Sequence, residues 1–128
     1  MEIIGQNIFK YTDYREYLTD ALKMARRRNP HFTIKGLAEY LGLSHRGHLY
    51  QILWGKRNIT PDISLRMTKV LKLKEMDTIY FEYLVMWQRA KSKLVQKEYF
   101  KRLCSLNPGF KSLRNELNKE KKVVRKRK

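Results

Sequence analysis

The stretch LSHRGHLYQILWGKR, residues 43–57, combines the apolar spacing of a helix with side chains that suit nucleic-acid recognition. Leu49, Ile52 and Leu53 fall on one side of a helical wheel and are expected to face the core. The opposite side and the first turn carry polar, small or aromatic residues: His45, Arg46, Gly47, His48, Tyr50, Gln51 and Trp54. A glycine inside a helix costs about 1 kcal/mol relative to alanine, so Gly47 indicates that the backbone approaches a partner closely.

The polar side of this helix has the chemistry needed to read DNA bases. A helix in the major groove presents its N-terminal residues to base edges. Gln51 can bond adenine through two hydrogen bonds, and Arg46 can do the same with guanine. We expect base contacts from His45, Arg46, Gly47, His48, Tyr50 and Gln51. Phosphate contacts, which position a protein without reading sequence, are expected from Ser44, Lys35, Lys56, Arg57, Arg27 and Arg28.

Two features of this helix admit other interpretations. His45 and His48 lie three residues apart and could share a metal ion, but the sequence shows no third ligand nearby, so no metal site is expected. Trp54 could stack on a sugar or a base, but we expect it to pack against a neighbouring helix.

The residues before this helix meet the steric requirements of a helix-turn-helix. Residues 33–41 predict a helix, in which Ala38 is small enough for a close crossing. Gly42 tolerates the positive φ that ends such a helix. Leu43 is expected to fill the turn, and Ser44 to cap the next helix.

Helical spacing continues along the chain and predicts an all-α fold, a compact bundle of five to six helices. Thr12 is the expected cap of a first helix, which Asn29-Pro30 ends. Thr60 is expected to cap another helix, with Pro61 at its first position. Residues 1–106 are expected to form one domain.

For two segments in the second half of the chain, the sequence does not decide what they contact. Residues 75–90 are apolar around so much of the helix that either a central position or a covering partner is expected. We expect a homodimer there, through Tyr80, Phe81, Tyr83, Val85 and Met86. Residues 107–128 predict a basic tail, partly disordered, that could act as a nucleic-acid-binding arm.

Charge is the outlying property of the composition. The 128 residues carry a formal charge of +17, and residues 1–110 alone contain 20 basic and 10 acidic side chains. Such a chain attracts polyanions, with nucleic acid the first candidate and an anionic membrane surface the second. The basic end KKVVRKRK has few bulky apolar residues with which to anchor in a membrane.

Other classes find little support in the sequence. Cys104 is the single cysteine, so no intramolecular disulfide is expected, and neither a membrane-spanning segment nor a signal peptide is evident. A cytoplasmic location is therefore expected. Asp13, Glu16 and Asp20 look like solvated partners of nearby cations. With no phosphate-binding glycine loop and no HExxH motif, we expect no enzyme, no cofactor and no small-molecule substrate.

Residues 33–73 resemble the lambda-repressor/Cro-like helix-turn-helix family through LAEYLGLS, GKRNIT and a helix ending VLKL. Leu49 and Ile52 fall one residue later than that family's usual spacing, which implies a turn one residue longer. Residues 7–106 are also similar to the N-terminal half of a bacterial family of paralogous regulator-like proteins, through DYREYL, NPHFTIKGLAEYLGLS, GKRNIT and YFEYLVMWQRAK. Its members usually continue into a longer C-terminal region. The resemblance implies a helix-turn-helix fold more strongly than a function.

The sequence therefore predicts a sequence-specific DNA-binding protein, a transcription regulator that reads the major groove of double-stranded DNA with the helix of residues 45–55. Two alternatives stay open. One is a helical protein–protein adaptor that uses the aromatic surface of residues 76–87. The other is a non-specific nucleic-acid binder driven by charge, including one that binds RNA.

Overall fold

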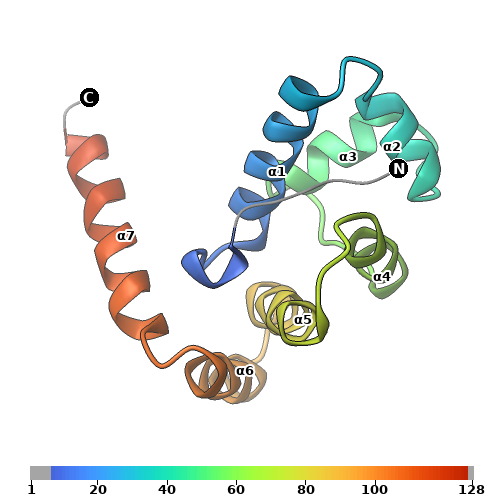
Figure 1. The fold of residues 1–128 in the computed structure, drawn as a ribbon. Helices are drawn as coiled ribbons and strands as arrows, with labels where there is room; N and C mark the ends of the chain where they lie inside the picture. The colour runs from blue at the N-terminus through green and yellow to red at the C-terminus, as the bar shows by residue number, and fades with distance from the viewer. Residues whose placement is uncertain (1–6, 127–128) are drawn as a thin grey trace.

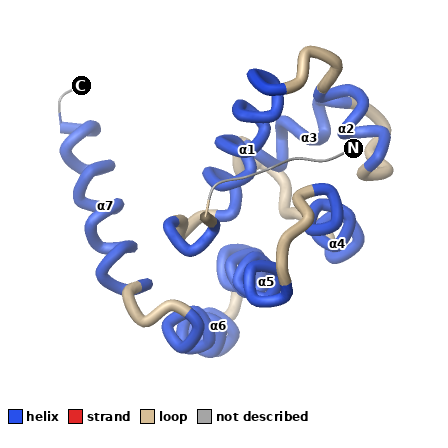
Figure 2. Tube along the Cα trace, in the orientation of Figure 1, coloured by secondary structure: helices blue, strands red, loops and turns tan. Residues whose placement is uncertain are grey.

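The computed structural model describes the main chain of residues 7–126 and the side chains of residues 7–120. This part of the chain is all-helical (Figure 1), and Figure 2 shows helices joined by short loops without a strand. A 3-10 turn precedes seven α-helices: η1 (Ile8–Lys10), α1 (Tyr14–Arg28), α2 (Ile34–Tyr40), α3 (Arg46–Leu53), α4 (Pro61–Val70), α5 (Glu75–Arg89), α6 (Lys93–Leu106) and α7 (Phe110–Lys126). The all-α prediction is confirmed, but the described residues contain more helices than the expected five to six.

Side-chain caps set the starts of several helices. Thr33 accepts a hydrogen bond from the Gly36 N–H at 3.0 Å and begins α2. Thr60 does the same for α4, with Pro61 at its first position, as predicted. The prediction for α1 was wrong by one residue: Asp13, not Thr12, is the cap, and its carboxylate accepts from the main chain of Arg15. A carboxylate there also interacts favourably with the helix dipole.

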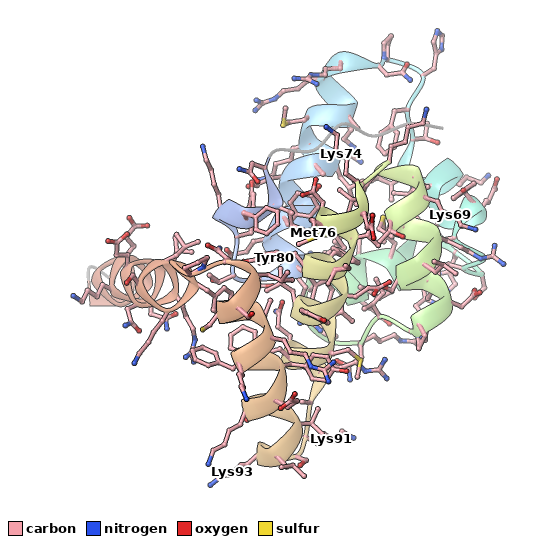
Figure 3. All side chains as sticks on the ribbon, turned by 60° about the horizontal axis from the view of Figure 1, so that its bottom comes forward. Lys69, Lys74, Met76, Tyr80, Lys91 and Lys93 are labelled. Atoms are coloured by element: carbon pink, nitrogen blue, oxygen red, sulfur yellow. The ribbon has the colours of Figure 1, made fainter. Side chains whose placement is uncertain are left out.

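Helix α5 lies at the centre of the fold. It packs against α1, α4, α6 and η1. Tyr80, Phe81 and Leu84 are fully buried, and the Tyr80 hydroxyl donates to the main-chain oxygen of Tyr11 at 2.6 Å. Figure 3 shows Tyr80 among the helices, whereas Lys91 and Lys93 lie at the outer end of α6.

The dimer surface expected on α5 is therefore wrong in its main residues. Phe81 and Val85 are buried, and Phe81 makes edge contacts with the rings of Tyr14 and Tyr17 of α1. Of the two interpretations of this apolar helix, the central position is correct, because neighbours within the chain already bury Tyr80, Phe81, Leu84 and Val85. The same burial removes Tyr80 and Phe81 from the surface that an adaptor would use.

The core continues past the boundary expected at residue 106. Phe110, the first residue of α7, is fully buried and contacts the rings of Tyr80, Trp87 and Phe100. Beyond that contact α7 runs away from the body of the bundle (Figure 1). The segment expected to be a partly disordered tail thus contains a helix; the side chains of residues 121–128 lie outside the described part.

Candidate nucleic-acid interface

The turn between α2 and α3 contains the positive-φ glycine that the sequence predicts. Gly42 adopts φ +77°, which an L side chain rarely tolerates. Its N–H bonds the Glu39 carbonyl at 3.0 Å, and the Leu43 N–H bonds the Ala38 carbonyl at 2.9 Å. These two bonds satisfy carbonyls that the end of α2 leaves unpaired, a Schellman motif. Leu43 is buried and fills the turn as predicted.

The start of α3 differs from the prediction. Ser44 was expected to be its cap, but the residue at that position is His45, which makes no side-chain cap bond. The extended backbone continues through His45, so the turn ends one residue later than Ser44. His45 and Arg46 are both exposed at this end of the helix, where neighbouring backbone N–H groups favour anions.

The two sides of α3 separate as the wheel predicted. Leu49 and Ile52 are buried, and Leu53 packs against the core while partly exposed. Gly47, His48 and Gln51 are partly exposed on the other side, whereas Tyr50, also partly exposed, packs against the core and faces α1. Of the residues predicted to contact bases, all except Tyr50 therefore lie along one accessible strip at α3.

A contact within the protein also explains why residue 47 is a glycine. A Cβ atom built at Gly47 would lie 3.0 Å from His45 Nδ1, closer than nine in ten real Cβ contacts. The missing side chain lets the His45 ring fold back over the first turn of α3. A close approach to DNA is thus no longer the single explanation for this glycine.

Arg15 fastens α1 to the end of α3, which the sequence did not reveal. Its Nε donates to the Ile52 carbonyl at 2.9 Å, and its Nη2 donates to the Arg57 carbonyl at 3.4 Å. Carbonyls at a helix C-terminus lack intrahelical donors and favour a cation. Arg15 therefore holds α3 in its orientation. Arg15 and Ile52 are 37 positions apart, so the spacing within either helix could not reveal this contact.

Arg57 was predicted to contact phosphate, and the structure places it against the accessible strip. Its Nη1 lies 2.7 Å from His48 Nε2. Because a guanidinium can only donate, Nε2 accepts and the His48 ring is neutral. Burial lowers the pKa of His48 below its usual value, and the positive charge of Arg57 and the proximity of His45 lower it further.

Trp54 lies exposed, contrary to the expected packing against a neighbouring helix. Its side chain is 66% exposed, and its ring stacks on Tyr50 with centroids 5.5 Å apart. Arg26 donates to the Tyr50 hydroxyl at 3.3 Å. Arg26 had not been among the predicted contact residues, whereas its neighbours Arg27 and Arg28 had; both of these are exposed at the end of α1.

A hollow of about 410 Å³ lies at the turn and is lined by predicted contact residues of both helices, Lys35, Ser44, His45 and Arg46, together with Glu39. Residues 21–61, which contain α2, α3 and the end of α1, hold eight basic side chains and one acidic side chain, Glu39. Coulomb attraction to a polyanion is therefore strong on this part of the molecule.

Within the described residues, no cluster of three or more potential metal ligands occurs. None of the described helices has the length and apolar character needed to cross a membrane. Comparison of the chain with models of protein families, with curated proteins and with solved structures gives no significant match.

Proposed function

We propose that this protein binds double-stranded DNA sequence-specifically, with α3 in the major groove, and acts as a transcription regulator. The observation that carries the proposal is the accessible strip of α3. It offers hydrogen-bonding side chains at the exposed end of a helix that is anchored on its other side by Leu49, Ile52 and Arg15. A rigid helix with such a strip fits the groove and holds its side chains at fixed positions.

The surrounding charge supports the same proposal. Lys35, Lys56 and Arg57 are exposed near the two ends of α3, where the sugar–phosphate backbones flank a helix lying in the groove. Phosphate contacts of this kind position the protein and make binding strongly dependent on salt. In the proposed complex Gln51 and Arg46 read bases, and the lysines set the depth and register of α3.

Selection from random duplex DNA tests the proposal directly. We expect one enriched motif, and its symmetry reports whether one copy or two bind the site. Enrichment of no motif, with equal binding to all duplexes, would replace sequence-specific recognition by charge-driven binding. Preference for RNA in a competition assay would also contradict the proposal.

Two substitutions locate the readout. Gln51→Ala and Arg46→Ala should each weaken binding to the selected site by about 1–3 kcal/mol and relax the preference at one base pair. Lys97→Ala is the matched control, because Lys97 is an exposed cation on α6. It should leave the base preference unchanged. A uniform loss with all sequences for Gln51→Ala and Arg46→Ala would make them phosphate contacts.

A further inference from the structure

Arg46 and Gln51 carry the proposed base reading, which leaves the stacked pair of Tyr50 and Trp54, at the C-terminal end of α3, without a role. Their rings lie 27° from parallel, and the aromatic surface that they form is accessible chiefly at Trp54. A groove of about 180 Å³ runs beside the pair, between α1 and α3. Leu22, Ile34 and Leu53 form part of its wall.

Cations border this aromatic surface. Lys56 Nζ lies 5.8 Å from the centre of the Trp54 ring. Lys23 and Arg26 line the groove, and Arg26 is bonded to the Tyr50 hydroxyl. The side chain of Lys56 is flexible, so its ammonium group can move from the Trp54 ring to a phosphate. Another flat group can then stack on the ring.

A second hollow that Trp54 lines has the reverse charge. Its wall includes three carboxylates, Asp13, Glu16 and Asp20, and one cation, Arg15, whose guanidinium donates to main-chain carbonyls. Carboxylates repel phosphates, so a nucleic-acid strand that meets Trp54 is confined to the side of Lys23 and Arg26. The charges thus define one path for a strand across the aromatic pair.

We propose that Trp54 and Tyr50 form a stacking site for an unpaired nucleobase, with Lys23, Arg26 and Lys56 holding the phosphates of its strand. This inference deepens the proposed function and rests on it in one respect, since both require a nucleic acid as ligand. The ligand class is a single-stranded segment, or a base that has left a duplex, next to the DNA read by the rest of α3.

The chemistry of the pair favours an unpaired base over a paired one. In a duplex the faces of each base are covered by its neighbours, and a protein reads the edges by hydrogen bonds. Trp54 offers a ring face, with a single N–H as its hydrogen-bonding group. Aromatic faces bordered by cations are the usual platform on which proteins stack the bases of single strands.

The tryptophan content of the chain permits a direct test. The sequence contains two tryptophans, and the other, Trp87, packs against Phe100 and Phe110 away from α3. Trp87→Phe therefore leaves Trp54 as the one fluorescent indole. In this variant of the full chain, single-stranded oligo(dT) should quench the fluorescence of Trp54. A blunt duplex of the same length should quench it less.

Substitutions then assign the affinity to the ring. Trp54→Ala should weaken binding of oligo(dT), measured by anisotropy of a labelled strand, roughly 5- to 100-fold. Trp54→Phe keeps a ring and should recover part of the loss. Leu65→Ala is the control, because Leu65 is an exposed apolar residue on α4. It should leave the affinity for oligo(dT) unchanged.

The outcomes separate this inference from the proposed function. Binding of selected duplex DNA without quenching of Trp54 by oligo(dT) would overturn the stacking site and leave sequence-specific recognition standing. Quenching by oligo(dT) without any preferred duplex would support the stacking site and overturn the proposed function. Equal loss for Trp54→Ala and Leu65→Ala would also overturn the stacking site, because the ring would then contribute nothing specific.

Discussion

Helices α3 and α5 both carry aromatic residues, but they use them in opposite ways. In α5, Tyr80 and Phe81 are fully buried and contact rings from other parts of the chain. At the C-terminal end of α3, the capping residue Trp54 is mostly exposed, and its stacking partner Tyr50 lies on the helix that it caps. An aromatic ring that finds its partner within its own helix remains available to a ligand. The composition of the two segments had suggested the reverse, with an interface on α5 and packing at Trp54.

Truncating one aromatic residue of each region to alanine should give the largest difference in the free energy of unfolding. Phe81→Ala should lower the free energy of unfolding by about 3–5 kcal/mol, because it leaves a cavity in the core. Trp54→Ala should change it by less than about 1 kcal/mol, since most of that ring is already in water. Urea unfolding followed by circular dichroism measures both. Similar losses for the two variants would contradict the contrast between buried and exposed rings.

High pH should lower the free energy of unfolding, because buried tyrosines then lose their protons. Burial raises the pKa of Tyr17 and of Tyr80 to about 12, above the unfolded value near 10. The unfolded chain therefore loses its tyrosine protons first, so stability is retained below pH 10 and falls as pH rises toward 12. Each tyrosine should account for roughly 2–3 kcal/mol over that range. Urea unfolding between pH 8 and pH 12 measures the loss.

Tyr80→Phe is the control for this pH effect. It removes one titrating hydroxyl, so stability should fall less steeply above pH 10 than in the unaltered protein. The same slope in both proteins would show that Tyr80 takes no part in the alkaline loss.

The turns that end α2 and α4 allow a matched test of backbone strain. Gly42 has φ +77°, and Lys72 occupies the equivalent position after α4 with φ +49°. A side chain in this left-handed region costs about 1–2 kcal/mol. Gly42→Ala should therefore destabilise the protein by about that amount, and Lys72→Gly should stabilise it by up to about 1 kcal/mol. Thermal unfolding should show shifts of opposite sign; equal signs would exclude backbone strain as the cause.

The smallest expected effect concerns His48 and Arg57. Burial and then the positive charge of Arg57 lower the pKa of His48 below 6.5, so the unfolded chain binds this proton more readily. Stability should therefore increase slightly as pH rises through the range just below 6.5. Arg57→Ala should raise the pKa of His48, which NMR titration of the ring protons measures. An unchanged pKa would show that Arg57 does not face His48 in solution.

The sequence determined most of the helices and the turn that joins α2 to α3. Thr33, Thr60 and Gly42 act within a few residues of their own positions, through caps and a positive φ, and such local interactions are visible in spacing. The division of α3 into a buried and an accessible side followed from its helical period for the same reason. Two local predictions, the caps at Thr12 and Ser44, were wrong by one residue, because the extended backbone continues to Asp13 and to His45.

Tertiary structure alone decided which apolar surfaces are covered. The period of α5 was compatible with a core position or with a partner, and the choice depended on rings of α1 and α7 that lie far away in the sequence. The contact of Arg15 with Ile52 and the bond of Arg26 to Tyr50 join residues 37 and 24 positions apart. Such contacts arise when helices pack, and packing depends on the shapes of both surfaces. The residue spacing within one helix describes the surface of that helix alone.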